Sequence, residues 1–350
     1  MAKTVRLADI GERLGVSTVT VSKALSGQTG VSEELREKII RLADEMGYRK
    51  STAEAKQTGK ESFTIGVIAA ERYLQENQSF YWLLYQEISK KAIEQNCFPM
   101  LEVISPEKED AGGFPKVVTE GKADGLIILG AFKGGYANRL IESKKLPMVN
   151  LDTTNGWEMC DCVVSNNFMG GCRMTDYLFE LGHEKIGFVG TRRSTSSIDD
   201  RYSGYLKSLM EHGAEWKEDW VIDDRSPDSG RIYKSDELIL PKEDMPTAFF
   251  CNCDLSAGLL IARLEKAGYG VPGDVSVAGF DNYMSGQSAG IGITTYETGA
   301  KEMAERAVHS MLQKCRNASY TSGTSGIFML AGRFIERESA RRIGPPVRTL

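Results

Sequence analysis

From residue 63 onward, short apolar runs alternate with longer amphipathic segments, and this alternation restricts the fold more than any other feature of the sequence. The runs that indicate buried strands are Phe63–Ala69, Leu126–Leu129, Met148–Leu151, Ile186–Val189, Ala248–Cys251 and Val275–Phe280. Amphipathic segments such as Phe80–Gln95 and Leu255–Ala267 lie between them. Repeated strand–helix–strand units predict parallel sheets with right-handed crossovers. The length of the pattern predicts two doubly wound lobes, in which ligands bind at the carboxyl ends of strands.

The first fifty residues have a different character, because they predict short helices and no strand. Apolar residues at helical spacing indicate helices over residues 9–14, 18–25 and 33–46. Gly15 ends the first helix, and Ser17 is expected to cap the second. The residues that follow, up to Ser62, include almost no large apolar side chain, which indicates a linker.

Charge is distributed unevenly along the chain. Residues 1–60 hold 11 Lys/Arg and 8 Asp/Glu, a net charge of +3, whereas the remainder holds 32 and 40, a net charge of −8. An acidic body with a basic head can hold nucleic acid at one end only. No stretch approaches the ~18 consecutive apolar residues of a membrane span. No apolar run follows the basic N-terminal residues, so we expect a cytoplasmic protein with no membrane association.

The cysteines and histidines do not indicate a metal site. The seven cysteines are at positions 97, 160, 162, 172, 251, 253 and 315. An odd number in a reducing compartment argues against a disulfide framework, and we expect small buried hydrophobic residues instead. The three histidines are scattered and show no zinc-type spacing with the cysteines. We therefore expect no metal and no cofactor.

Short polar side chains gather on one face of the second predicted helix. Ile10, Leu14, Val21 and Leu25 can pack inward. The outward residues are then Ser17, Thr18, Val19, Thr20, Ser22 and Lys23. Hydroxyl groups suit phosphate oxygens and base edges, and an apolar side chain suits the methyl group of thymine. The pattern favours a DNA-recognition helix over a generic helical hairpin.

The same residues carry a family resemblance that continues along the whole chain. In the head the matching residues are Val16-Ser17-x-x-Thr20-Val21-Ser22-Lys23-x-Leu25-x-Gly27, Val31-Ser32-x-x-x-Arg36-x-Lys38-Ile39 and Gly47-Tyr48. In the rest they are Gly66-Val67-Ile68, Ala123-Asp124-Gly125-Leu126-Ile127, Leu181-Gly182-His183-x-x-Ile186-Gly187-Phe188-Val189-Gly190, Arg201-x-x-Gly204-Tyr205, Val271-Pro272-x-Asp274-Val275-Ser276-Val277-x-Gly279-Phe280-Asp281-Asn282, Thr294-Thr295 and Ile335-Glu336-Arg337-Glu338-Ser339. In this order they resemble the lactose-repressor (LacI/GalR-type) family.

The resemblance implies an all-α helix-turn-helix head and an α/β core of two doubly wound parallel-sheet lobes, similar to periplasmic binding proteins. It implies a DNA-binding domain at 1–50, a hinge linker at 51–62 and an effector-binding and dimerisation core at 63–350. Lobe one is expected at about 63–163 plus 293–326, and lobe two at about 164–292 plus 327–340. The expected protein is a homodimeric regulator, usually a repressor, that binds a palindromic operator. Its effector is expected to be a small molecule such as a sugar or sugar derivative.

The resemblance also implies which head residues contact DNA. Those facing bases would be Thr18, Val19 and Lys23, and those nearer phosphates would be Ser17, Thr20 and Ser22. Lys23 stands where most members have arginine. Because lysine is a single-point donor and arginine grips guanine with two bonds, we expect relaxed discrimination at that base.

The linker departs from the family pattern. In the family it folds on the operator into a helix whose leucine enters the minor groove and kinks the DNA. Here Gln57 occupies the position of that leucine, and the customary proline after Tyr48 is absent. Glutamine can form hydrogen bonds in the groove but does not readily unstack a base step. We hypothesise a weaker kink, or a hinge that orders differently.

In the core, the resemblance places the effector between the lobes. Arg201 and Asp281 occupy positions that commonly hold sugar hydroxyls, and a fork donor with a two-oxygen acceptor suits vicinal hydroxyls. A salt bridge within one lobe, or a helix cap, is the alternative for both. The further candidates are Phe80 and Tyr81, with core packing as the alternative; Asn252 and Asp254, of which Asp254 is also expected to cap the next helix; and, more weakly, Asn166 and Ser197.

The sequence also bears on two other classes of protein. An enzyme is disfavoured because the sequence has no Gly-x-Gly-x-x-Gly after a strand, no phosphate-loop motif, no Gly-x-Ser-x-Gly and no His-x-x-x-His. His183 precedes a strand, and a role in positioning its loop is favoured over catalysis. A sugar-binding protein without operator function is the remaining alternative, and the basic head argues against it.

Overall fold

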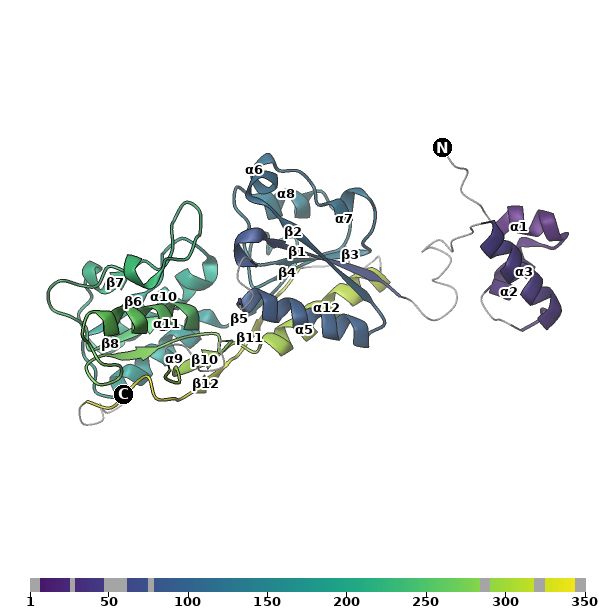
Figure 1. Ribbon diagram of the computed structural model, residues 1–350. Coiled ribbons are helices and arrows are strands. Elements are labelled where there is room, and N and C mark those ends of the chain that lie inside the picture. Colours follow the sequence, from purple (N-terminus) through teal and green to yellow (C-terminus); the bar gives the residue numbers. More distant parts are fainter. Residues whose placement is uncertain are drawn as a thin grey trace. The chain divides into compact units, whose positions relative to one another are not determined.

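The computed structural model describes residues 7–25, 29–46, 62–74, 79–283, 290–317 and 325–343. The chain separates into two compact units, Met1–Ser62 and Phe63–Leu350. We name them the head and the core (Figure 1). Gln57, the residue expected at the wedge position of the hinge, lies outside the described residues.

Within its described residues the head consists of α1 (Leu7–Leu14), α2 (Thr18–Leu25) and α3 (Glu33–Glu45). These helices share a small buried cluster of Ile10, Val21, Ala24, Ile39 and Ala43. Gly15 adopts φ 68°, a left-handed conformation that suits glycine and turns the chain between α1 and α2. The Ser17 hydroxyl accepts a hydrogen bond of 3.1 Å from the backbone N–H of Thr20, which confirms the predicted cap.

Lobe one of the core is built on a six-stranded sheet in the order β11-β5-β4-β3-β1-β2, in which all neighbouring strands are parallel. Its strands are β1 (Thr64–Ala70), β2 (Phe98–Ile104), β3 (Gly125–Leu129), β4 (Met148–Leu151), β5 (Asp161–Ser165) and β11 (Ile327–Leu330). Helices α5 (Phe80–Glu94) and α12 (Ala300–Arg316) cover one face (Figure 1). The other face carries α6 (Pro106–Ala111), α7 (Lys116–Thr119) and α8 (Tyr136–Glu142), and the short helix η1 (Glu71–Tyr73) follows β1.

Lobe two is built on a smaller parallel sheet in the order β7-β6-β8-β9. Its strands are β6 (Ile186–Val189), β7 (Val221–Ile222), β8 (Ala248–Cys251) and β9 (Ser276–Ala278). Helices α9 (Asn167–Glu180) and α10 (Ser196–Glu211) cover one face, and α11 (Asp254–Lys266) covers the other. The short helices η2 (Glu218–Trp220) and η3 (Ser235–Glu237) flank β7, and β10 (Thr295–Glu297) pairs antiparallel with β12 (Arg333–Ile335).

The observed architecture confirms the predicted fold class, and the bounds of the six predicted strands agree with the structure within two residues. The expected division of the lobes differs at the C-terminal crossings. Residues 327–330 form β11 and pair with β5 in lobe one, although 327–340 was expected in lobe two. Tyr296 of β10 belongs to the apolar core of lobe two, although 293–326 was expected in lobe one. The crossings depend on pairing between segments far apart in the sequence, which local patterns do not reveal.

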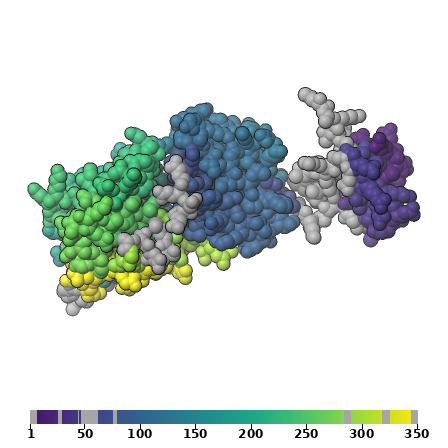
Figure 2. All heavy atoms as spheres, in the orientation of Figure 1, coloured from purple at the N-terminus to yellow at the C-terminus, as the bar shows by residue number. Residues whose placement is uncertain are grey.

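The colouring of the space-filling view follows these crossings. The yellow-green residues of α12 lie against lobe one, and the yellow residues that follow β11 lie along lobe two (Figure 2). Among the described residues, the chain passes between the lobes at residues 165–167, 297–300 and 330–333. Because the chain crosses between the lobes at several points, residues of both lobes can contribute to one ligand site between them.

Helices α9 and α10 meet backbone to backbone. A Cβ atom on Gly204 would lie 2.2 Å from the carbonyl oxygen of Phe168, and one on Gly171 would lie 2.4 Å from that of Arg201. Side chains larger than hydrogen therefore cannot occupy these two positions without moving a helix. The close approach holds Arg201, on α10, beside Asn167 at the start of α9.

Most of the cysteines and His183 are buried in the structure. Six of the seven cysteines are buried, as expected of small hydrophobic residues. His183 is buried, and its ring lies 2.9 Å from the Thr247 hydroxyl and 3.2 Å from the carbonyl oxygen of Arg341. Burial lowers the pKa of His183 to about 4, so its neutral ring positions the loop before β6. None of the described helices is both long and apolar enough to cross a membrane.

Candidate functional site

The exposed face of α2 carries the residues predicted to read DNA. Val19 is 61% exposed, so its aliphatic side chain is available to contact a partner. Thr18 and Lys23 are also exposed, while Thr20 and Ser22 are half-buried. The face therefore presents an aliphatic group, a hydroxyl and a cation from a single helix, which is the combination that base edges and phosphates require.

Arg36, on α3, holds the other end of this helix. Its guanidinium donates hydrogen bonds to the carbonyl oxygens of Ala24 at 2.9 Å and Lys23 at 3.4 Å. These carbonyls lie in the last turn of α2, where helix carbonyls generally need a partner from outside the helix. A cation at this end also interacts favourably with the helix dipole. The recognition helix is thus capped at its start by Ser17 and at its end by Arg36.

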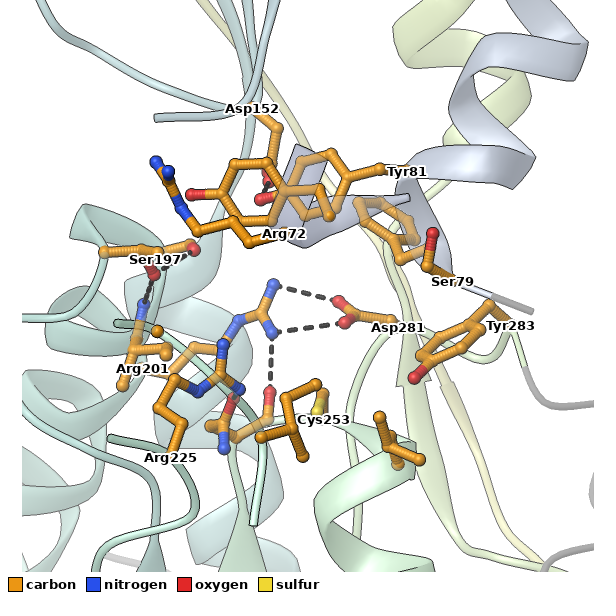
Figure 3. Close-up of a pocket in the computed structure, with 18 of the residues that line it drawn as sticks. Arg72, Ser79, Tyr81, Asp152, Ser197, Arg201, Arg225, Cys253, Asp281 and Tyr283 are labelled. Carbon is orange, nitrogen blue, oxygen red and sulfur yellow. Dashed lines mark hydrogen bonds and ion pairs between the residues drawn. The ribbon is translucent and has the colours of Figure 1, made fainter. Parts of the chain in front are cut away.

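A cavity of about 150 Å³ lies between the two lobes of the core. Figure 3 shows Arg72, Tyr81 and Asp152 of lobe one facing Arg201, Arg225 and Cys253 of lobe two, with Asp281 and Tyr283 at one side. The complete lining is Arg72, Tyr73, Ser79, Phe80, Tyr81, Asp152, Thr195, Ser197, Ile198, Arg201, Arg225, Gly230, Arg231, Ile232, Asn252, Cys253, Leu255, Asp281 and Tyr283. Aromatic rings and charged groups thus line one small cavity, which we call the interlobe pocket.

Arg201 and Asp281 form an ion pair in the wall of the interlobe pocket. Both side chains are almost fully buried, and Arg201 Nη2 lies 2.9 Å from Asp281 Oδ1 (Figure 3). The guanidinium also donates to Asn167 Oδ1 at 2.9 Å and to the Asn252 carbonyl oxygen at 2.5 Å. Its carbon lies 3.9 Å from the centre of the Phe280 ring. The pair is therefore a salt bridge within lobe two, and it is at the same time part of the pocket wall.

Asp152 faces this pair from lobe one. It follows β4 in a left-handed conformation, with φ 61°, and its Oδ2 accepts a hydrogen bond of 2.9 Å from the Tyr81 hydroxyl. Burial raises the pKa of Asp152 to about 6, even though Arg201 lowers it. The ring of Tyr81 in turn stacks on Tyr73 at 4.2 Å between centroids. Lobe one thus contributes an acceptor and an aromatic surface.

Asn252 belongs to a buried network next to the pocket. Its amide nitrogen donates to Asp224 Oδ2 at 2.7 Å and to the carbonyl oxygen of Val189 at 3.0 Å. Arg225 Nε donates to Asp224 Oδ1 at 2.9 Å. Burial raises the pKa of Asp224, but Arg225 and these bonds bring it well below its ordinary value. Since its donors are used within lobe two, Asn252 fixes the position of Arg225, whose side chain lines the pocket.

Residues 224–233 form a hairpin that reaches from lobe two to lobe one. Arg225 and Ile232 form an antiparallel bridge, and the Tyr233 N–H donates to the Asp224 carbonyl oxygen at 2.9 Å. At the tip, Lys133 of lobe one donates to the carbonyl oxygen of Asp228. The hairpin residues 225 and 230–232 line the interlobe pocket, so this segment closes one side of it.

Two of the predicted effector residues do not line the pocket. Asn166 caps α9, since its Oδ1 accepts a hydrogen bond of 3.1 Å from the Met169 N–H. Asp254 is buried, and its Oδ1 accepts a hydrogen bond of 2.6 Å from the Thr295 hydroxyl. Nor does Asp254 cap α11 as expected, because the residue at the cap is Cys253 and its side chain makes no capping bond. Its Oδ1 instead bonds to Thr295 at the start of β10.

The head and the core each match the model of a known protein family. Residues 6–51 match the model for bacterial regulatory proteins of the lacI family, and residues 175–340 match the periplasmic binding protein-like domain. The chain belongs to the lacI family. This membership makes it a DNA-binding transcription regulator and not an enzyme, as the sequence predicted.

Individual relatives of the lacI family agree over almost the whole chain. The HTH-type transcriptional repressor PurR of Erwinia tasmaniensis is 27% identical over 343 residues, covering 95% of this chain and 96% of the relative. PurR of Pectobacterium carotovorum is 28% identical over 320 residues, covering 88% and 89%. Both alignments thus cover most of this chain and most of each relative.

Solved lacI-family structures share the fold. The transcriptional regulator CelR in complex with cellobiose is 21% identical, with a TM-score of 0.69 over 96% of this chain and 99% of that one. The lac repressor dimer bound to operator and the anti-inducer ONPF is 19% identical, with a TM-score of 0.71 over 97% and 100%. At this identity the likeness describes the architecture, and the ligand of each structure is a property of that protein.

Sequence reasoning missed several residues of the interlobe pocket, of which Arg72, Asp152 and Arg225 are the most prominent. All three follow strands of the parallel sheets at their carboxyl ends. The rule that ligands gather at these ends was available from the sequence and would have identified Asp152, directly after the predicted strand 148–151. Among the described residues, no three His, Cys, Asp or Glu side chains are grouped as metal ligands.

We expect Asp152→Asn to stabilise the core at pH 7.5, by up to about 3 kcal/mol for a pKa displaced by about two units. Because the pKa of Asp152 in the folded state lies above the ordinary value of 3.8, the folded state binds more protons than the unfolded state between about pH 4 and 6. Stability from this group therefore falls as pH rises through that range. Asparagine tolerates the left-handed backbone of Asp152.

Denaturant unfolding at pH 7.5 and pH 4.5 tests this expectation. The advantage of Asp152→Asn should shrink at the lower pH, where the parent carboxyl is protonated. Asp254, whose pKa burial raises to about 7, is present in both proteins and cancels in the comparison. An equal difference at both pH values would contradict the assignment.

Proposed function

We propose that the protein is a cytoplasmic transcriptional repressor that binds a palindromic operator as a homodimer. We further propose that a sugar or sugar derivative in the interlobe pocket sets its affinity for DNA. The observation that carries the proposal is the pairing of Arg201 and Asp281 opposite Asp152 in a cavity between two lobes. Such a ligand would act by binding unequally to lobe arrangements that do and do not favour operator binding.

The chemistry of the interlobe pocket supports a polyhydroxylated ligand. Asp152 and Asp281 supply acceptors from the two lobes, and Arg201 supplies donors between them. Tyr81 and Phe80 supply aromatic surface, which apolar faces of sugar rings require. Phe80 also belongs to the apolar core of lobe one. It therefore both packs in that core and lines the pocket. Ser197 contributes a hydroxyl group to the same wall.

The apolar edge of lobe one supports self-association. Strand β2 ends the six-stranded sheet, and its Phe98 and Val103 are 67% and 45% exposed. Ile93, close by at the end of α5, is 66% exposed. Uncovered apolar side chains on an edge strand favour pairing with another chain. A second copy of this chain would cover them and bring two heads to one operator.

The experiment that tests the proposal starts by selecting duplexes from randomised DNA with the full chain. We expect palindromic half-sites about 10 bp apart, with affinity that falls steeply with salt. Cellobiose, ribose and a panel of other sugars are then added to the selected duplex. We expect at least one to change DNA affinity by about fivefold or more. Failure to select any sequence, with or without sugars, would favour a sugar-binding protein without operator function.

Lys23 allows a prediction about base readout. Lys23→Ala is expected to cost about 1–3 kcal/mol at one base position and to leave the other positions unchanged. Lys23→Arg is expected to sharpen the preference for guanine there, because arginine donates two parallel bonds. Affinity measured on single-base variants of the selected operator checks both. A loss that is equal for all sequences would instead identify Lys23 as a phosphate contact.

A further inference from the structure

The connection between β7 and β8 departs from the usual construction of a parallel sheet. Parallel strands that follow one another along the chain are generally joined by a helix that covers one face of the sheet. In lobe two α10 joins β6 to β7, and α11 joins β8 to β9. The segment 223–247, which is described throughout, contains only the three-residue helix η3. The face of the sheet beside α11 therefore lacks a covering helix at β7.

A groove remains at this place. Its volume is about 660 Å³. We name it the β7 groove, and its lining is Glu218, Asp219, Val221, Ile222, Asp223, Tyr233, Glu237, Ile239, Leu240, Pro241, Lys242 and Glu243. Ile222 is buried, whereas Ile239 is 79% exposed. An isoleucine with so much surface in water, beside other apolar residues, is a natural contact for a binding partner.

The polar lining of the β7 groove is mostly acidic. Its charged side chains are five carboxylates and one lysine, Lys242, beside the hydroxyl group of Tyr233. Two of the carboxylates have arginine partners outside the lining, Glu218 with Arg192 and Glu237 with Arg231. Asp219, Asp223 and Glu243 add further negative charge at exposed positions. A nucleic acid is repelled by such a surface, while a cationic segment is attracted.

We propose that the β7 groove binds a short segment of a partner protein in which lysine or arginine residues flank aliphatic side chains. The aliphatic groups would contact Ile239 and Leu240, and the cations would pair with Asp219 and Glu243. This chemistry is distinct from the sugar recognition proposed above, and the two sites share no lining residue. The proposal therefore does not depend on the identity of the effector.

The test uses the full chain and a fluorescein-labelled peptide of sequence Lys-Lys-Leu-Ile-Lys-Lys, followed by fluorescence anisotropy. We expect saturable binding at one site per chain. Two control peptides, Lys-Lys-Ser-Ser-Lys-Lys and Glu-Glu-Leu-Ile-Glu-Glu, should bind at least tenfold more weakly. Hydrogen exchange should show protection of residues 221–223 and 238–243 by the first peptide. No saturable binding at peptide concentrations up to about 1 mM would overturn the proposal.

Matched variants separate a specific groove from general attraction to an acidic protein. Ile239→Ser, and the double variant Asp219→Asn with Glu243→Gln, are each expected to weaken binding about tenfold or more. The double variant Asp110→Asn with Glu120→Gln removes the same charge from exposed positions on lobe one and should leave binding unchanged. Equal weakening by both double variants would overturn the proposal. Thermal unfolding of each variant verifies that the core remains folded.

Discussion

Arg201→Met is expected to abolish the response to the effector and to lower the free energy of unfolding of the core by about 3–5 kcal/mol. The side chain of Arg201 is 5% exposed, and removing it leaves the carboxylate of Asp281 buried without its cation. The same loss removes the donor that faces Asp152 in the interlobe pocket. Effector affinity should fall by at least about 30-fold, the equivalent of about 2 kcal/mol.

A second variant separates the two consequences of losing Arg201. Adding Asp281→Asn to Arg201→Met removes the uncompensated charge, so the double variant should recover much of the stability. It should not recover effector affinity, because the donors of the guanidinium are still missing. Denaturant unfolding and calorimetric titration with a sugar that changes operator affinity measure the two effects. Parental affinity in Arg201→Met would exclude this residue from the effector site.

Gly204→Val is expected to destabilise the core by about 3 kcal/mol or more and to weaken effector binding. A Cβ at this position would lie 2.2 Å from the carbonyl oxygen of Phe168, which belongs to the backbone of α9 and cannot rotate away. The two helices must separate, and Arg201 then moves away from Asn167 on α9. The substitution should therefore disturb a pocket that Gly204 does not line.

Gly113→Ala is a suitable control for Gly204→Val. No heavy atom lies within 4 Å of a Cβ built on Gly113, and this glycine does not have a positive φ. Its replacement should change stability by less than about 0.5 kcal/mol and leave effector binding intact. Thermal unfolding together with effector titration checks both variants. A Gly204 variant that unfolds like the Gly113 control would show that α9 and α10 can separate at little cost.

Some of the effector residues predicted from the sequence line the interlobe pocket and others do not, and the difference has a physical reason. The motifs predict Arg201 and Asp281 as effector residues, and both line the pocket, but motifs alone do not decide whether they also pair with each other within lobe two. Asp254 is predicted from the family resemblance and Asn166 from its polarity, and the structure uses both side chains inside lobe two. Polarity indicates that a side chain needs a partner, but only tertiary structure determines whether the partner is the protein or a ligand.

The course of the chain between the lobes was also beyond local patterns. Residues 327–330 show the same short apolar character whichever sheet they join, and their place beside β5 depends on residues 162–165, far away in the sequence. Hairpin 224–233 and the missing helix before β8 likewise carry no periodic pattern. Such features arise from long-range packing, whose energy is not contained in any window of neighbouring residues.

By itself the sequence determined the helix-turn-helix head, the alternation of strands and helices, and the family. These follow from hydrophobic periodicity, from capping residues such as Ser17 and from motifs, all of which act over a few residues. The tertiary structure alone decided which charged groups meet. It brought Asp152 to face Arg201 across the lobes and left β7 without a covering helix. Contacts of this kind depend on where distant backbones pack, because burial and charge pairing act through space.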